Sequence, residues 1–476
     1  YSSTEQRLVS SEIKAATVAE RAIEPEPESE VPGSLRDAGA LRFWFAVVLT
    51  GLAAGIGAAL LTALLRAVQQ LAWGAGEPSA LTEAARAASP GRHIALLLSA
   101  GLITGAGQWL LTRLSSGNGI DITAAIWFQA GRLPTLRTLG SALLSIVIVG
   151  MGAALGREGA PKQTGAVFGN LASSLQKLSD EQRRLMVAIG AGAGMAAVYS
   201  VPLGGAVFAL EVLRGKLALR LVLPALAASM IATKTATFVV ADAPLYTTPA
   251  FVISAKVYVW AILAAPLIGL WSVGLVRAIA WADRARPSDW RRIVAPPLVF
   301  LAIGLASIPY PEVLGNGQDV AQFLFVHPLA PLPLLVLLLL RPTCTVASVA
   351  CGAPGGLFTP SLAAGALAGS VLGALWLWIF PEGDIGVYAL LGGGAMLAAT
   401  TQGPISSLVL MMELTGQARQ FALPMLVAIV VATATARTIE MRSIYEARLS
   451  DEEVSRRLAA RGPSGETGLD KEPSST

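Results

Sequence analysis

The sequence has few cysteines, few histidines and few charged residues. Its two cysteines, Cys344 and Cys351, lie in the same apolar run, so we expect neither a disulfide framework nor a cysteine-ligated metal site. Two histidines, His93 and His327, are too few for histidine-rich metal chemistry. Basic clusters interleaved with aromatic residues are also missing outside the apolar runs, which argues against nucleic-acid binding. We therefore expect no metal, no cofactor and no nucleic-acid partner.

The shortage of charge also indicates where the chain resides. Only 14% of the residues are charged, 54% are hydrophobic, and the mean hydropathy is +0.61. Soluble domains are usually more polar than this. The runs without Asp, Glu, Lys or Arg are Phe43–Leu65, Ile94–Thr112, Thr138–Gly156, Leu185–Leu210, Val257–Val276, Pro342–Pro381 and Ile385–Met412. Most are long enough to cross about 30 Å of hydrocarbon, so the composition predicts an all-α polytopic membrane protein in a lipid bilayer.

Polar segments flank this apolar region. Residues 1–40 contain closely spaced glutamates and prolines and cannot bury enough apolar surface to fold alone. Residues 450–476 are polar as well. Arginines gather in short loops such as Arg277–Arg292, and the positive-inside rule places these loops in the cytoplasm. We expect both polar segments to be cytoplasmic tails and see no removable targeting segment.

The sequence repeats itself internally. Ser116–Asp121 is echoed by Leu314–Asp319, and Gly156–Pro161 is echoed by Gly356–Pro360 at nearly the same offset, roughly 200 residues. The two halves run over residues 41–241 and 252–449. Apolar segments interrupted by Gly and Pro at corresponding places are typical of repeats built around broken helices. Spacing alone leaves open whether the repeats are parallel or inverted.

Three glycine-rich breaks precede apolar helices: Gly117–Gly119, Gly156–Gly159 and Gly355–Thr359. A helix that begins inside a membrane presents unpaired N–H groups and the positive end of its dipole, so it attracts an anion. Converging starts would form a partly dehydrated anion site. Each break taken singly could also be a plain corner between two helices.

Glu158 follows a charge-free run at membrane depth, where an ionisable side chain is costly and usually functional. A carboxylate at a helix start can occupy the anion site itself, and protonation removes the charge that holds it there. We therefore predict that Glu158 is a gate that couples protonation to anion movement. The alternative is a structural ion pair between Glu158 and its neighbour Arg157.

The chain resembles the CLC family of chloride channels and chloride/proton antiporters, in the prokaryotic form without CBS domains. The motifs that carry the resemblance are Gly117-Asn118-Gly119-Ile120, Gly156-Arg157-Glu158-Gly159, Gly356-Leu357-Phe358-Thr359-Pro360 and Ser443-Ile444-Tyr445. The resemblance covers the region from about Leu41 to about Leu449. It implies two inverted halves with broken, tilted helices, a homodimer in a bacterial inner membrane, and one anion pathway in each subunit.

The resemblance also implies roles for single residues. Glu158 would be the external gate and proton acceptor. The anion would bind to Asn118, to the backbone amides of Leu357 and Phe358, and to the hydroxyl of Tyr445. The helix starts around this site contain Gly117, Gly119, Gly156, Gly159 and Gly356. The expected substrate is a small inorganic anion, chloride by default, together with protons if the protein is an antiporter.

Three positions depart from the family's pattern. Asn118 stands where the family usually has serine, which leaves fluoride and nitrate open as the preferred anion. Val212 occupies the position of the internal proton-transferring glutamate, so channel and antiporter both stay open, and its neighbour Glu211 is read as structural. Ala160 stands where the family's gate motif normally has proline, and Pro161 is shifted by one place. Lys162 follows in the same helix, one turn beyond Glu158. It could raise the local anion potential, snorkel to the interface or pair with a carboxylate such as Glu413.

Two other classes of protein compete with anion transport. A cation-coupled solute carrier also uses broken-helix repeats, and its intramembrane carboxylate would have to be Asp121 or Asp319. A membrane enzyme would need a nucleophile, a metal or paired acids at one depth. The sequence has no His–Glu zinc motif and no second carboxylate near Glu158, so we do not expect an enzyme.

Overall fold

The computed structural model describes residues 31–32, 36–75, 80–114, 121–446, 449 and 452. In this part of the chain the regular structure is helical, and the only β-type pairing is one isolated bridge. The predicted all-helical fold is therefore confirmed. Gly117, Asn118 and Gly119 lie outside the described residues, as does most of the two predicted tails.

The helices of the first half begin at residue 40. They are α2 (Ala40–Trp73), α3 (Leu81–Ala87), α4 (Pro90–Leu114), α5 (Ile122–Phe128), α6 (Thr135–Gly150), α7 (Gly159–Leu175), α8 (Asp180–Tyr199), α9 (Pro202–Phe208), the π-helical segment η3 (Ala209–Arg214) and α10 (Leu219–Ala236). A capping box at Ser179 and Gln182 starts α8 immediately after the end of α7. Pro202 at the first turn starts α9 after only a short break.

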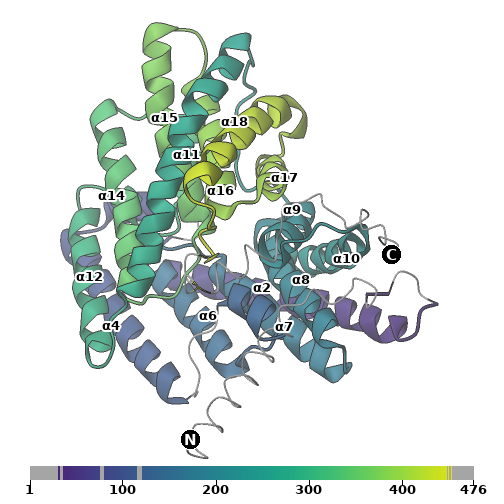
Figure 1. Cartoon of the computed structure of the whole chain (residues 1–476). Helices are drawn as coiled ribbons and strands as arrows, with labels where there is room; N and C mark the ends of the chain where they lie inside the picture. Colours follow the sequence, from purple (N-terminus) through teal and green to yellow (C-terminus); the bar gives the residue numbers. More distant parts are fainter. Residues whose placement is uncertain are drawn as a thin grey trace, which may run out of the picture.

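The second half repeats this order of long and short helices. It contains α11 (Ala255–Arg284), α12 (Arg291–Ser307), the 3-10 turn η4 (Pro311–Val313), α13 (Gln318–Val326), α14 (Pro331–Ala350), α15 (Phe358–Ile379), α16 (Ile385–Thr401), α17 (Pro404–Thr415) and α18 (Ala418–Ile439). α7 packs on α8 as α15 packs on α16, and α2 packs on α10 as α11 packs on α18. In Figure 1, α14 to α18 fill the upper part of the view and α6 to α10 the lower part.

Equivalent segments of the two halves meet in antiparallel, reciprocal pairs. The Glu211 carboxylate accepts hydrogen bonds from the backbone N–H groups of Ile405 (3.2 Å) and Ser406 (2.6 Å) at the start of α17. The Glu413 carboxylate accepts hydrogen bonds from Leu203 (3.1 Å) and Gly204 (2.6 Å) at the start of α9. Each half thus caps a helix start of the other, as two inverted halves require. Glu211 has the structural contacts expected of it, and Glu413 is engaged at α9.

Within the described part of the chain, seven helices are long and apolar enough to cross a membrane, and α6, α16 and α17 are shorter apolar helices. The seven are Ala40–Trp73, Pro90–Leu114, Leu219–Ala236, Ala255–Arg284, Pro331–Ala350, Phe358–Ile379 and Phe421–Ile439. The charge-free runs miss α10, which has Arg220 and Lys234 near its two ends, and α18, which has Arg437 in its last turn. They also miss the first half of α14, because Arg341 lies in its middle. A basic residue at a helix end reaches the membrane interface and need not interrupt the span. The multi-pass membrane prediction is confirmed.

Glycines set how closely α7 and α8 approach. A Cβ built on Gly190 would lie 2.1 Å from the carbonyl oxygen of Gly165, so any side chain there would collide with the α7 backbone. At the equivalent contact between α15 and α16, a Cβ on Gly369 would lie 2.2 Å from the carbonyl oxygen of Tyr388. Small residues allow this backbone-to-backbone packing of membrane helices. These contacts fix the positions of α7 and α15, whose first residues form the site described below.

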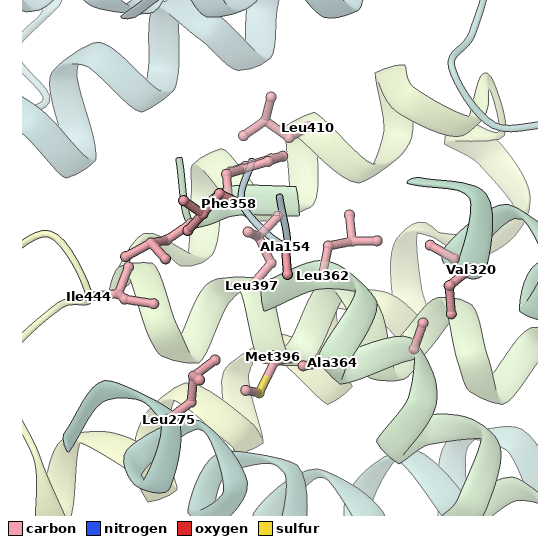
Figure 2. Packing of buried hydrophobic residues seen from close by; sticks show 14 of the residues in the cluster. Ala154, Leu275, Val320, Phe358, Leu362, Ala364, Met396, Leu397, Leu410 and Ile444 are labelled. Atoms are coloured by element: carbon pink, nitrogen blue, oxygen red, sulfur yellow. The ribbon is translucent and has the colours of Figure 1, made fainter. Parts of the chain in front are cut away.

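The core around the start of α15 draws on several helices. Figure 2 shows Phe358 and Leu362 of α15 near Leu397 of α16 and Leu410 of α17, with Ala154 of the segment before α7 among them. All are buried. The first turn of α15 is therefore held from several sides by packing, which limits its movement.

Candidate functional site

The first residues of α7 and α15 lie next to each other, and each follows a turn at a glycine. α6 ends before Gly152 (φ +111°) and α14 ends before Gly352 (φ +88°), where the left-handed conformation suits glycine. The chain then crosses in two short segments whose Gly156 and Gly356 bond to each other reciprocally, with N···O distances of 2.7 and 2.8 Å. The repeat found in the sequence is thus a physical contact between the halves.

The carboxylate of Glu158 lies at the start of the other half's helix. Its Oε1 accepts a hydrogen bond from the Phe358 N–H at 2.7 Å, so it occupies the positive end of α15. Its Oε2 accepts hydrogen bonds from the hydroxyls of Tyr199 (3.1 Å) and Thr359 (3.2 Å). The residue is fully buried. Hydrogen bonds from three donors and a helix dipole compensate for burying the charge.

Glycines surround this carboxylate because nothing larger fits. A Cβ on Gly156 or on Gly356 would lie 2.1 Å from Oε1 of Glu158. A Cβ on Gly159 would lie 2.7 Å from the backbone nitrogen of Gly356. The predicted helix-start glycines of these two motifs therefore line the carboxylate, and together they leave a cradle for one anionic group.

Arg157 and Glu158 do not form an ion pair in the structure, although both residues are described. The Arg157 guanidinium instead lies 5.1 Å from the centre of the Tyr199 ring, in a cation–π contact. Arg157 is buried and does not snorkel. The carboxylate of Glu158 finds its partners in the second half of the chain and in Tyr199.

A row of aromatic rings runs from the carboxylate toward Tyr445. The Phe358 ring stacks on Tyr199 with centroids 6.1 Å apart and meets Phe208 edge-on at 6.5 Å. Phe208 in turn meets Tyr445 at 5.7 Å. Leu357 precedes Phe358 as the N-cap residue of α15. Phe358 and Tyr445 are therefore linked through the Phe208 ring, and the backbone N–H of Phe358 is bonded to Glu158.

Lys162 lies at the far end of this row. Its Nζ donates a hydrogen bond to the Tyr445 hydroxyl at 3.2 Å and lies over the Tyr445 ring at 4.3 Å. Lys162 is buried against these groups and lines a cavity of ≈ 450 Å³. The glycine segment before α15 and the side chain of Tyr445 also line this cavity, which we name the Lys162 cavity. Of the interpretations that the sequence leaves open for Lys162, snorkelling does not fit this buried position.

Sequence reasoning missed Tyr199 and Thr359 as partners of the gate. Tyr199 ends α8 just before Ser200, whose φ of +56° turns the chain into α9, and no charge or motif marks Tyr199 in the sequence.

Val212, at the predicted internal position, is buried in η3. It packs closely on Gly403 of the second half, where an added Cβ would lie 2.5 Å from the Val212 side chain. Among the described residues no group of three or more His, Cys, Asp or Glu could hold a metal ion.

Comparisons with known proteins agree with this arrangement. The family profile described as "Voltage gated chloride channel" matches residues 95–437. A "Voltage-gated ClC-type chloride channel ClcB" from Salmonella typhi is 34% identical over 411 residues, covering 82% of this chain and 96% of that protein. A "Putative chloride channel protein ClcB-like" from Ralstonia nicotianae is 30% identical over 421 residues, covering 85% and 96%.

Solved structures share the fold. A slow cyanobacterial Cl⁻/H⁺ antiporter superposes with a TM-score of 0.73 at 23% identity, covering 88% of this chain and 98% of that one. A CLC-type fluoride/proton antiporter superposes with a TM-score of 0.65 at 20% identity, covering 87% and 99%. At such identities the likeness concerns the fold alone. Because the profile spans most of the sequence and the curated relatives match over nearly their whole length, the chain belongs to the CLC family of voltage-gated chloride channels.

Proposed function

We propose that the protein moves small monovalent anions across a membrane, with chloride as the default substrate and Glu158 as the gate. One observation carries this proposal: the carboxyl group of Glu158 accepts a hydrogen bond from the Phe358 amide at the start of α15, where a free anion would also bind. Protonation removes the charge that holds the carboxylate in this position. The side chain then leaves, and an anion takes its place.

The anion path connects this gate with the Lys162 cavity. Gly159, Gly356 and Leu357 line both the cavity and the surroundings of the carboxylate, and Tyr445 lines the cavity beside them. The amides of Leu357 and Phe358 and the hydroxyl of Tyr445 are the proposed anion ligands, and Asn118 remains a proposed ligand outside the described residues. Because these donors are neutral, they bind an anion without holding it so tightly that conduction stops.

The Lys162 cavity faces the cytoplasm in this proposal. Asp283 and Arg286, at the connection between α11 and α12, line the cavity, and this connection is rich in arginine. By the positive-inside rule, this side of the protein is cytoplasmic. Glu158 then lies at the external end of the path. Both chain ends lie in the cytoplasm in this orientation. The proposed membrane is the bacterial inner membrane. The two membrane halves keep their proposed boundaries, 41–241 and 252–449.

We further propose that the protein is a homodimer. Exposed apolar side chains lie on α9, α10, α17 and α18, which pack against one another in the order α10, α9, α17, α18 and so form one continuous face. The members of this apolar face are Leu203, Leu219, Leu223, Met230, Ile405, Leu423, Leu426 and Val430. The reciprocal caps of Glu211 and Glu413 lie at its centre. A face centred on the contact between the two halves suits self-association by a two-fold axis.

Flux from proteoliposomes tests the function. Vesicles that contain the protein and are loaded with chloride should release it when a potassium ionophore clamps the voltage. The Glu158→Gln variant should lose the pH dependence of this release, because glutamine keeps the shape of protonated glutamate but does not titrate. Glu382→Gln is the matched control, since Glu382 lies in an exposed loop and pairs with Lys256. Absence of chloride, fluoride and nitrate release from folded protein would refute the function, and unchanged gating in Glu158→Gln would refute the gate.

Proton coupling is decided by the reversal potential under crossed anion and pH gradients. Val212 is apolar, buried and unable to carry a proton, which favours anion movement without tight proton coupling. A reversal potential that follows the anion gradient alone would establish a channel. A reversal potential that also moves with pH would establish an antiporter and require another proton route. The same measurement with fluoride and nitrate ranks the anions.

A further inference from the structure

Lys162 shares a helix face with the gate. Its backbone N–H donates to the Glu158 carbonyl oxygen at 3.2 Å, so the two residues stand one turn apart on α7. The carboxylate of Glu158 turns toward Phe358, and the side chain of Lys162 turns toward Tyr445 and Phe208. One turn of helix therefore holds a negative group at one end of the aromatic row and a positive group at the other.

The surroundings of Lys162 offer several favourable contacts to an ammonium group. The Phe208 ring lies 5.4 Å and the Tyr445 ring 4.3 Å from Nζ, and both ring faces attract a cation. The Tyr445 oxygen accepts a hydrogen bond from Nζ. Gln108, Gln163 and other polar residues also line this cavity, which is large and polar enough to hold water.

The hydrogen bond between Lys162 and Tyr445 also orients the tyrosine. Because the Tyr445 oxygen accepts from the ammonium, its own O–H proton points away from Lys162 and is a donor in another direction. An adjacent positive charge polarises this O–H group and strengthens it as a donor. The ammonium and the phenol thus form two adjacent donors of the kind that binds a small anion.

Lys162 is also placed among the other charges of the cavity. Asp121, Asp283 and Arg286 line it as well, and Arg286 pairs with Asp283 at 2.7 Å. Lys162 differs from these residues because it shares its part of the cavity with Tyr445 and the glycine segment Gly355–Leu357, next to the gate. An anion that passes the two aspartates would find its strongest attraction there.

We propose that Lys162 Nζ and the Tyr445 hydroxyl form a charged anion-binding site of this protein, one helical turn from the gate, that takes a small monovalent anion. This inference rests on the anion path proposed above and adds a fixed cation to it. On the cavity side the anion retains part of its hydration shell. On the other side the Lys162 ammonium and the Tyr445 hydroxyl donate hydrogen bonds to it. The site holds an anion while Glu158 is still ionised, because the lysine charge offsets that of the carboxylate. Lys162 is therefore a specificity-determining residue that favours anions over neutral solutes and over cations.

Calorimetric titration of chloride into the purified, detergent-solubilised protein tests this site, with isethionate as the background anion. Lys162→Met keeps the length of the side chain and removes the charge. It should weaken chloride binding by about tenfold or more, the loss expected for one charge-assisted hydrogen bond. Lys162→Arg should stay within about threefold of the original protein, because it retains a charged donor. Lys177→Met is the matched control, as Lys177 is exposed beyond the end of α7.

The outcome also separates this inference from the proposed function. If chloride release from vesicles is seen and Lys162→Met binds chloride within about threefold of the original protein, the site is refuted and the function stands. If no anion is released by the original protein, the function fails whatever the titration gives. A folding defect is excluded by a size-exclusion profile, and weakened binding in both Lys162→Met and Lys177→Met would also refute the site.

Discussion

Glu158 behaves in this structure as a tethered anion. Its carboxylate accepts hydrogen bonds from a helix N-terminus and two hydroxyls and is surrounded by glycines. These are the groups that typically form an anion-binding site. Because the anion is part of the chain, its local concentration is high, and a free ion competes only once the carboxylate is protonated. The binding groups and the gate are therefore the same few residues.

Tyr199 donates a hydrogen bond to the proposed gate, Glu158, and its hydroxyl can be removed without loss of the ring. Tyr199→Phe deletes the hydrogen bond to Glu158 and retains the stacking on Phe358. A hydrogen bond to an ionised group contributes about 1.5–3 kcal/mol, so the bound position of the carboxylate is weakened and chloride release at pH 7 should rise by about tenfold or more. Stopped-flow or electrode records of release measure this.

Tyr246→Phe is the control for this change. Tyr246 is equally buried, and its hydroxyl has no hydrogen-bond partner among the described residues. The chloride release rate of Tyr246→Phe should match that of the original protein. Equal rates in Tyr199→Phe and Tyr246→Phe would show that Tyr199 does not hold the gate.

Glu440 supplies a pH-dependent contribution to stability outside the membrane spans. Hydrogen bonds from Arg442, the larger cause, and from Arg277 lower the pKa of Glu440 to about 2, against 4.5 for an ordinary glutamate. A lowered pKa means that the stabilisation is complete above about pH 4.5 and is lost as the pH falls toward 2. Glu440→Gln should lower the unfolding temperature at pH 7, and the difference should shrink as the pH falls. A difference that stays constant between pH 7 and pH 3 would contradict this.

At the scale of single residues, the sequence predicts the charged side chains of the site and misses two hydroxyl groups that bind Glu158. Glu158 stands out because a carboxylate in an apolar run is rare, and Lys162 stands out for the same reason. Tyr199 and Thr359 do not stand out, because hydroxyl residues are common in membrane helices and only the crossing of the chain brings them to Oε2.

Broken helices determine the site at the scale of elements. α7 and α15 begin inside the protein, and each start is positioned by close packing on the following helix, α8 or α16. The repeated glycine motifs predict where these helices begin. They do not predict that the carboxylate of one start binds the amide of the other, because this depends on the antiparallel crossing at Gly156 and Gly356.

The contact between α7 and α8 should not accept a methyl group. Gly190→Ala would place its Cβ 2.1 Å from the Gly165 carbonyl oxygen, so the helices must separate. Overpacking of this kind costs about 1–3 kcal/mol, and the unfolding temperature in detergent should fall by several degrees. Chloride release should fall too, because α7 carries Glu158.

Gly274→Ala is the matched control. A Cβ at Gly274 has no atom within 4 Å, and alanine favours a helix over glycine. Gly274→Ala should leave the unfolding temperature unchanged or raise it. Equal behaviour of the two variants would show that the interlocking glycines do not set the helix spacing.

At the scale of the whole molecule, two inverted halves share one site between them. The first half supplies Glu158 and Lys162, and the second supplies Phe358 and Tyr445. A single subunit thus contains all the described groups of the path. The sequence repeats reveal the two halves. The sequence alone does not distinguish the apolar face on α9, α10, α17 and α18 from lipid-facing surface, because that requires the arrangement of the helices in space.

Disruption of this apolar face should separate subunits without stopping transport. Tryptophans at Leu223 and Leu423, which are exposed on α10 and α18, should give a monomer by light scattering after size exclusion. Chloride release per subunit should stay within about threefold, because every described group of the path belongs to one chain. Leu60→Trp, at an exposed position on α2, is the control and should remain dimeric. A mutant that stays dimeric would place the interface elsewhere.

The reciprocal pair of hydrogen bonds between Gly156 and Gly356 limits how the molecule can work. It joins the two halves beside the proposed anion site, and close glycine contacts hold α7 against α8 and α15 against α16. A rocking motion of one half against the other would have to break both Gly156–Gly356 hydrogen bonds in each transport cycle. In the proposed mechanism the moving part is therefore the Glu158 side chain in a rigid frame, and the rate of transport should depend on how often this side chain picks up a proton rather than on how fast the two halves can rotate.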